Sequence, residues 1–127
     1  MSDTTQTRFA HRRLDAFRVA LELFKGVEEL AAKLPRGYAD HKDQLRRAAA
    51  AVARNIAEGA NRAHSRDKAS RFTVARGECG ECDASLEMIE LLDIVDPFDV
   101  RRLRRLADRV GAMLLGLIRR ERSRALP

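Results

Sequence analysis

The sequence predicts an all-α protein, and three observations carry that prediction. Alanine and leucine are abundant while the 127 residues include only seven glycines and three prolines, a composition that favours helices over sandwiches, barrels or disorder. Four stretches repeat apolar residues at spacings of three and four, the period of one helix face. Short connections between such stretches favour antiparallel neighbours. We therefore expect one domain over residues 1–127, folded as an antiparallel up-down-up-down four-helix bundle. Its ordered core is expected over about residues 14–120, with a basic C-terminal end that frays.

The first two helices are expected over about residues 15–33 and 40–61. The first ends where Pro35 biases the preceding residue out of the helical region. The second is rich in alanine, which has the best helix propensity and lets neighbouring helices approach closely. The apolar stripes consist of Phe17, Leu21, Phe24, Val27, Leu30 and Leu34 in the first helix, and of Leu45, Ala49, Val52, Ile56 and Ala60 in the second.

The last two helices have recognisable starts. The third is expected from Ser65, as its N-cap, to near Val95. The fourth follows with Asp96 as N-cap and Pro97 as the first helical residue. The apolar stripes consist of Phe72, Ala75, Cys79, Cys82, Leu86, Ile89 and Leu92 in the third helix, and of Val100, Leu103, Leu106, Val110, Met113, Leu114, Leu117 and Ile118 in the fourth.

Charge is arranged in blocks along the chain, whose formal net charge is +6. In an antiparallel bundle the acidic block lies beside the start of the fourth helix, so we interpret it as paired with arginines, within one chain or between subunits, and otherwise solvated. The two strongly basic blocks contain more cations than nearby acids can pair. The net charges are +1 for residues 1–35, +6 for 36–76, −8 for 77–100 and +7 for 101–127.

The excess of arginine predicts a surface that binds phosphate. Of the 25 cationic side chains 21 are arginines, and the guanidinium fork suits bidentate phosphate contacts. Aromatic residues make up 5% of the chain, so base stacking is not expected, and binding to RNA or DNA is expected at the backbone with a steep dependence on salt. The candidate nucleic-acid-binding residues are Arg46, Arg47, Arg54, Arg62, Arg66, Arg71 and Arg76.

No arrangement of catalytic or metal-ligating residues accompanies these features. Cys79 and Cys82 form a C-x-x-C pair, but it falls in the middle of a predicted helix and on its apolar stripe. We interpret both as core residues, with a redox response as the weaker alternative. His11, His41 and His64 follow no zinc-site spacing. We expect no enzymatic activity, no metal and no cofactor.

The chain also lacks the apolar segments that direct proteins to membranes. No stretch approaches the roughly 18 apolar residues of a membrane span. The polar start of the sequence has no signal-peptide core. We therefore expect a cytoplasmic protein without membrane contact.

A polar motif near the end of the second helix, Asn-Ile-Ala-Glu-Gly at residues 55–59, is expected to connect two helices. Buried Asn and Glu side chains require hydrogen bonds, and we expect Asn55 and Glu58 to find them on neighbouring turns, at Arg47 or Glu81.

The same motif is part of a wider resemblance. Together with Gln44-Leu45-Arg46-Arg47-Ala48-Ala49, Phe72, Ala75-Arg76-Gly77 and Glu81, it resembles the bacterial four helix bundle protein family. That family includes proteins encoded within intervening sequences of large-subunit ribosomal RNA genes and, distantly, the accessory protein of diversity-generating retroelements. The matching motif residues, to which the resemblance gives a structural role, are Gln44, Asn55, Glu58, Gly59 and Glu81.

The resemblance implies a four-helix bundle that assembles as a ring-like homopentamer, has a basic surface and lacks enzymatic activity. It further implies association with nucleic acid or with a reverse transcriptase. We therefore expect a basic homo-oligomer that binds RNA or DNA and is accessory to an RNA or reverse-transcription process. The alternative is a protein–protein interaction scaffold whose charge blocks serve self-assembly, with oligomers that dissociate as salt screens the pairs.

Overall fold

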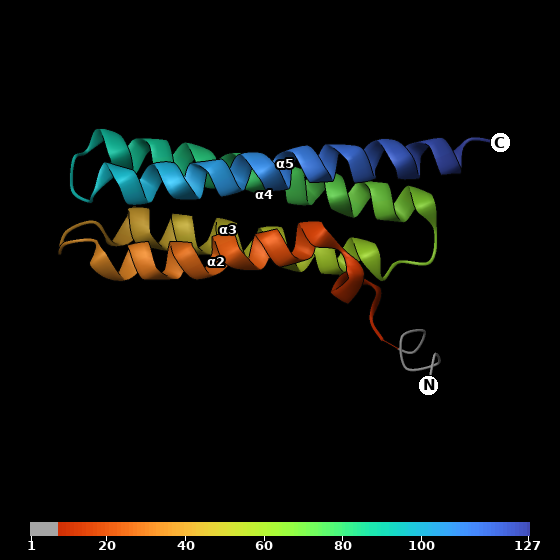
Figure 1. The fold of residues 1–127 in the computed structure, drawn as a ribbon, viewed down its shortest axis with the longest axis horizontal. Coiled ribbons are helices and arrows are strands. Elements are labelled where there is room, and N and C mark those ends of the chain that lie inside the picture. The colour runs from red at the N-terminus through yellow and green to blue at the C-terminus, as the bar shows by residue number, and fades with distance from the viewer. Residues whose placement is uncertain (1–7) are drawn as a thin grey trace.

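The protein is a bundle of four long helices preceded by one short turn of 3-10 helix (Figure 1). The computed structural model describes residues 8–127, and that part of the chain contains no β-strand. The α2–α3 and α4–α5 connections lie at one end of the bundle, and the α3–α4 connection lies at the other. The predicted all-α fold with four helices is confirmed. The elements are η1 (Ala10–Arg13), α2 (Asp15–Lys33), α3 (Ala39–Ala60), α4 (Ser65–Leu91) and α5 (Pro97–Ala125).

The four helices surround a single core. Each packs against two neighbours in the cyclic order α2, α3, α4, α5, and the diagonal pairs make no close backbone contact. Two residues predicted on core stripes, Leu21 and Leu92, are instead exposed. None of the helices in residues 8–127 is long and apolar enough to cross a membrane. The largest fully buried side chains include Leu23, Leu45, Ile56, Phe72, Leu86, Ile89, Leu103 and Leu114.

The helix starts follow the sequence signals only in part. The Asp96 side chain accepts a hydrogen bond from the backbone N–H of Phe98 at 2.9 Å, so the predicted cap of α5 is confirmed. The predicted cap of α4 is wrong, because Ser65 is already the first helical residue and His64, which precedes it, makes no capping hydrogen bond.

Two helix ends also differ from the prediction. The helix α4 ends at Leu91 rather than near Val95, because Asp93 adopts a positive φ of 57° that a right-handed helix does not accommodate. The basic segment expected to fray instead continues α5 to Ala125. Its Glu121 is only 2% exposed, so the helix packs against the bundle at that residue, while Arg122, Ser123 and Arg124 are exposed.

One close contact sets the spacing between α3 and α4. A Cβ atom placed on Gly59 would lie 2.8 Å from two ring atoms of Phe72, which is 2% exposed. The Gly59 position therefore has no room for a side chain while the Phe72 ring keeps its place. This gives a physical reason for glycine at the end of the Asn-Ile-Ala-Glu-Gly motif.

We expect Gly59→Ala to destabilise the protein by about 1–3 kcal/mol, the usual cost of forcing an extra methyl group into a packed core. Denaturant unfolding followed by circular dichroism measures the change. The control is Gly116→Ala in α5, where an added Cβ meets no atom within 4 Å and alanine is expected to stabilise the helix slightly. Equal stability of the two variants would contradict the proposed contact.

Candidate nucleic-acid interface

The fold gathers basic residues from three separate parts of the chain at one end of the bundle, which we call the basic end. The α3–α4 connection and the last turns of α5 both lie there (Figure 1), and η1 packs against α3 close by. Arg66 and Arg122 line the same groove of about 630 Å³ between α4 and α5. The basic end comprises Arg13, Arg62, Arg66, Lys68, Arg71, Arg120, Arg122 and Arg124.

The buried carboxylate of Glu121 forms ion pairs with two arginines of the basic end. Glu121 Oε2 lies 3.3 Å from Arg124 Nη1 and 3.6 Å from Arg120 Nε. Its other oxygen, Oε1, is buried and has no hydrogen-bond partner among residues 8–127. A cavity of about 240 Å³ beside it is also lined by Lys68 and Arg13. A buried carboxylate needs cations around it, so Glu121 holds Arg120 and Arg124 near one another.

Hydrogen bonds at the end of α3 fix the local backbone of the basic end. Lys68 Nζ donates to the carbonyl oxygen of Ala60 at 2.8 Å, which satisfies a carbonyl at the helix C-terminus. The Asn61 side chain accepts a hydrogen bond from the backbone N–H of Ala10 at 2.8 Å and donates to the Ala57 carbonyl at 2.8 Å. These bonds attach η1 and the start of α4 to the same helix end.

Glu58 connects α3 to α4, although not through the expected partners. It forms ion pairs with Arg62 in the connection and with Arg71 on α4, the latter at 3.7 Å. The hydrogen bond from Arg62 lowers the pKa of Glu58. Asn55 was expected to bond to a neighbouring helix, but its Nδ2 donates to the Ala51 carbonyl of its own helix at 2.9 Å. The predicted partners Arg47 and Glu81 are therefore wrong.

The remaining residues of the family motif lie apart from the basic end. Gln44 and Glu81 both line a groove of about 400 Å³ between α3 and α4, together with Ala84 and Met88. Gly59 packs against Phe72 as described above. Gln44 and Glu81 are exposed, and Gly59 is the motif residue that packs against a neighbouring helix, so the motif residues do not form one binding site.

The seven arginines predicted to bind phosphate do not form one surface. Arg62, Arg66 and Arg71 belong to the basic end. Arg46 lies about 21 Å from Ala60, the last residue of α3, at the helical rise of roughly 1.5 Å per residue. There it forms a bidentate pair with Glu28 of α2, at 2.6 and 3.1 Å. Arg46 is thus engaged within the bundle.

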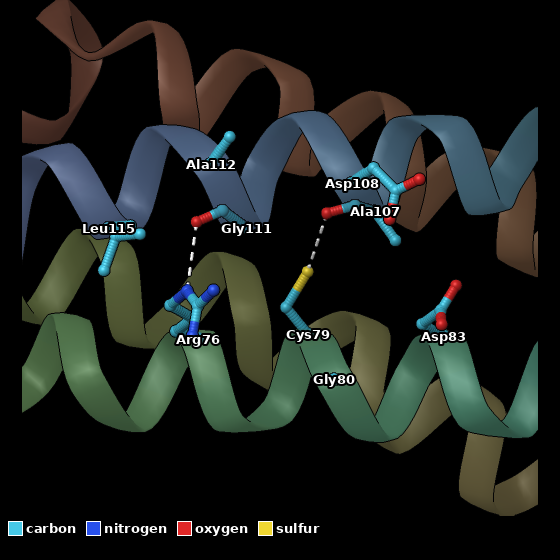
Figure 2. Close-up of a pocket in the computed structure, with 9 residues that line it drawn as sticks. All are labelled: Arg76, Cys79, Gly80, Asp83, Ala107, Asp108, Gly111, Ala112 and Leu115. Atoms are coloured by element: carbon cyan, nitrogen blue, oxygen red, sulfur yellow. Dashed lines mark hydrogen bonds between the residues drawn. The ribbon is translucent and has the colours of Figure 1, made fainter.

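The other three predicted arginines lie along the sides of the bundle. Arg47 and Arg54 are exposed on α3 and have no ion pair among residues 8–127. Arg76 lies on α4, and its Nε donates to the Gly111 carbonyl of α5 at 3.2 Å (Figure 2).

The α5 residues of the basic end were not among the predicted site residues. Arg120, Arg122 and Arg124 belong to a block that was recognised as strongly basic, but its end was expected to fray. The net charge of that block, combined with an antiparallel path for α5, is the signal that points to them. Their neighbours on α4 are far away in the sequence, so charge spacing along the chain alone does not reveal the site.

The acidic block behaves as predicted and pairs with the start of α5. Arg104 forms a bidentate pair with Asp83, with Nε 2.9 Å from Oδ1, and also approaches Glu87 at 3.4 Å. Arg101 pairs with Glu90 at 3.0 Å. Arg101 and Arg104 are therefore engaged within the bundle, whereas the arginines at the end of the block are not matched by an equal number of acids.

The two cysteines are core residues, as the apolar stripe predicts. Both are free thiols, and they are 3% and 0% exposed. Cys79 Sγ donates a hydrogen bond to the Ala107 carbonyl at 3.2 Å, across the α4–α5 contact (Figure 2). Burial raises the pKa of Cys79 to about 11 and that of Cys82 to about 12. No group of three or more potential metal ligands occurs in the described part of the chain.

Comparison with known proteins identifies the family. The sequence profile described as 23S rRNA-intervening sequence protein matches residues 12–116, which is most of the chain. The protein belongs to this family. The match confirms the resemblance that the residue motifs indicate.

Other comparisons with known proteins support the fold alone. One solved structure with the same fold is a protein with unknown function from the S23 ribosomal protein family of Bacteroides thetaiotaomicron. It superposes with a TM-score of 0.75 at 16% identity, covering 81% of this chain and 97% of the other. No curated protein sequence matches this member of the 23S rRNA-intervening sequence family.

At pH 8 we expect Cys79 and Cys82 of the folded protein to resist iodoacetamide, because both thiols are buried and their raised pKa values keep them protonated. In denaturant, where both become exposed, they should be alkylated at the rate of ordinary cysteine. Mass spectrometry of timed samples measures both rates. Rapid labelling of the folded protein would revive the redox alternative.

Proposed function

We propose that this protein is a non-enzymatic bundle that binds RNA or DNA through backbone phosphates at its basic end, as an accessory to an RNA or reverse-transcription process. One observation carries the proposal. Arg66 of α4 and Arg122 of α5 line one open groove, and neither has an ion pair among residues 8–127. Unpaired guanidinium groups that converge on one groove suit a phosphate chain.

The other residues of the groove around Arg66 and Arg122 also support binding to a phosphate backbone. The groove also contains Ser70 and Thr73, whose side chains are of the type that contact phosphate and sugar. It contains no aromatic residue, so base stacking does not contribute and binding is expected to be largely independent of sequence. The family description, 23S rRNA-intervening sequence protein, is consistent with a role connected to RNA.

The double variant Arg66→Glu/Arg122→Glu is expected to weaken binding to a labelled structured RNA and to duplex DNA at least tenfold. The slope of log affinity against log salt should fall by about 2, since each lost phosphate contact removes roughly one released counterion. Fluorescence anisotropy across a salt series measures both quantities.

The matched control is Arg102→Glu/Arg105→Glu, which makes the same change in net charge on the first half of α5. Both residues are exposed and have no ion pair within residues 8–127. Equal losses in the two double variants would mean that net charge, rather than the groove, governs binding. Absence of binding by the unmodified protein at physiological salt would favour the alternative scaffold function.

The other expectations raised by the sequence stay predictions. These are the assembly as a ring-like homopentamer, the association with a reverse transcriptase and the cytoplasmic location. The residues of the basic end belong to one chain, so nucleic-acid binding there is proposed independently of these three expectations.

A further inference from the structure

The cavity beside Glu121, which we call the Glu121 cavity, is lined by more cations than acids. It has a volume of about 240 Å³ and lies where η1, the end of α3, the start of α4 and the last turns of α5 meet. Glu121 is the acid among its lining residues, and the cations are Arg13, Lys68, Arg120 and Arg124. Because four cations surround one carboxylate, the cavity attracts an anion.

The Glu121 carboxylate is only partly satisfied by the protein. Its side chain is 3% exposed. The contacts to Oε2, 3.3 Å from Arg124 and 3.6 Å from Arg120, are longer than the roughly 2.7–2.9 Å of a charge-assisted hydrogen bond. The other oxygen, Oε1, has no hydrogen-bond partner among residues 8–127. A buried oxygen without a partner is destabilising, so a ligand that donates a hydrogen bond to Oε1 removes that cost.

The cations of the Glu121 cavity keep donors for a ligand. Lys68 Nζ donates to the Ala60 carbonyl at 2.8 Å. An ammonium group has three N–H donors, so two remain once that bond is made. The side chains of Arg120 and Arg124 are 51% and 59% exposed, so they move to admit a ligand or close over it without disturbing the core. Their guanidinium groups bind the oxygens of an anion in pairs.

A ligand that suits this cavity is an anion that also donates a hydrogen bond. The four cations repel ammonium groups, and a neutral hydroxyl group leaves their charge unmatched. Carboxylates, sulfate and the phosphodiesters of a nucleic-acid backbone carry no proton at neutral pH, so they only accept hydrogen bonds. A phosphate with a P–O–H group meets both requirements, because its charged oxygens accept from the cations and its hydroxyl donates to the carboxylate.

We propose that the Glu121 cavity is a binding site for a phosphate group that carries a proton, supplied by inorganic phosphate or by the terminal phosphomonoester of a nucleic acid. The P–O–H group donates to Glu121 Oε1, and the charged oxygens accept from Lys68 and Arg124. A water molecule needs roughly 10–15 Å³ of such space, so the cavity has room for an ion of five heavy atoms. The groove of Arg66 and Arg122 is lined by other residues, so the proposal does not rest on nucleic-acid binding there.

Phosphate and sulfate at pH 8 test the requirement for a proton. Both ions are tetrahedral and predominantly dianionic at this pH, and only phosphate carries a proton. Isothermal titration calorimetry at constant ionic strength should show that the unmodified protein binds inorganic phosphate at least tenfold more tightly than sulfate. Equal affinity for the two ions, or no binding of phosphate, overturns the proposal.

Glu121→Gln tests the role of the carboxylate. The amide keeps the shape of the side chain, has no charge to repel a fully deprotonated anion and supplies an N–H donor. The preference for phosphate over sulfate should therefore disappear. Circular dichroism checks that the variant is folded. A preference of unchanged size in the folded variant contradicts the proposed hydrogen bond to Glu121.

Arg124→Gln provides a second test at an exposed position, where the fold is expected to be kept. The variant removes one cation from the Glu121 cavity and should weaken phosphate binding at least fivefold. The matched control is Arg105→Gln, an exposed arginine in the first half of α5, which should leave phosphate binding unchanged. Equal weakening in both variants would mean that net charge governs the binding and would overturn the proposal.

Short oligonucleotides distinguish the two sources of phosphate. They compete with bound inorganic phosphate at about pH 6, where a terminal phosphomonoester is partly protonated, in the Arg66→Glu/Arg122→Glu variant. Displacement by a 5′-phosphorylated oligonucleotide but not by its 5′-hydroxyl counterpart assigns the cavity to nucleic-acid ends, and displacement by neither assigns it to inorganic phosphate. Equal displacement by both overturns the proposal, because the cavity then accepts phosphodiesters.

The calorimetric test uses no nucleic acid, so its outcome is independent of the groove of Arg66 and Arg122. The Arg66→Glu/Arg122→Glu variant should bind inorganic phosphate as the unmodified protein does. Failure of the nucleic-acid proposal and failure of this one are therefore distinguishable.

Discussion

The contact between Gly59 and Phe72 is the constraint on which the basic end depends. With no side chain at Gly59, the Phe72 ring fills the space between α3 and α4, and the two helices meet closely just before and after their connection. That approach brings Glu58 within reach of Arg71 and Lys68 within reach of the α3 C-terminus. The absence of a side chain at Gly59 thus determines where Glu58 and Lys68 find their partners.

Some arginines form ion pairs within the bundle, whereas others have no ion pair and can bind a ligand. Arg46 and Arg104 form bidentate pairs that tie α3 to α2 and α5 to α4. Surface pairs of this kind contribute little free energy individually, but they neutralise cations that a count of charges would assign to a binding surface. Arg66 and Arg122 keep their charge unmatched at one end of the bundle, where it is accessible to phosphate.

The helices α4 and α2 show what apolar periodicity determines and what it leaves open. The α4 core residues Phe72, Cys79 and Cys82 stand out because they share one helical face, and their burial follows that period. Leu21 lies on the predicted apolar stripe of α2 but is 43% exposed, because periodicity identifies the apolar side of a helix and does not show how far the neighbouring helix covers it.

The sequence by itself determined the four helices, their antiparallel order, the core and the family, since these follow from local periodicity, caps and short connections. Only the tertiary structure decided which charges are neighbours. Ion pairs and grooves join residues far apart in the chain, such as Arg66 with Arg122, and depend on the rotation of each helix about its axis. That rotation is set by side-chain packing between helices, as at Gly59 and Phe72, and charge counts along the sequence carry no information about it.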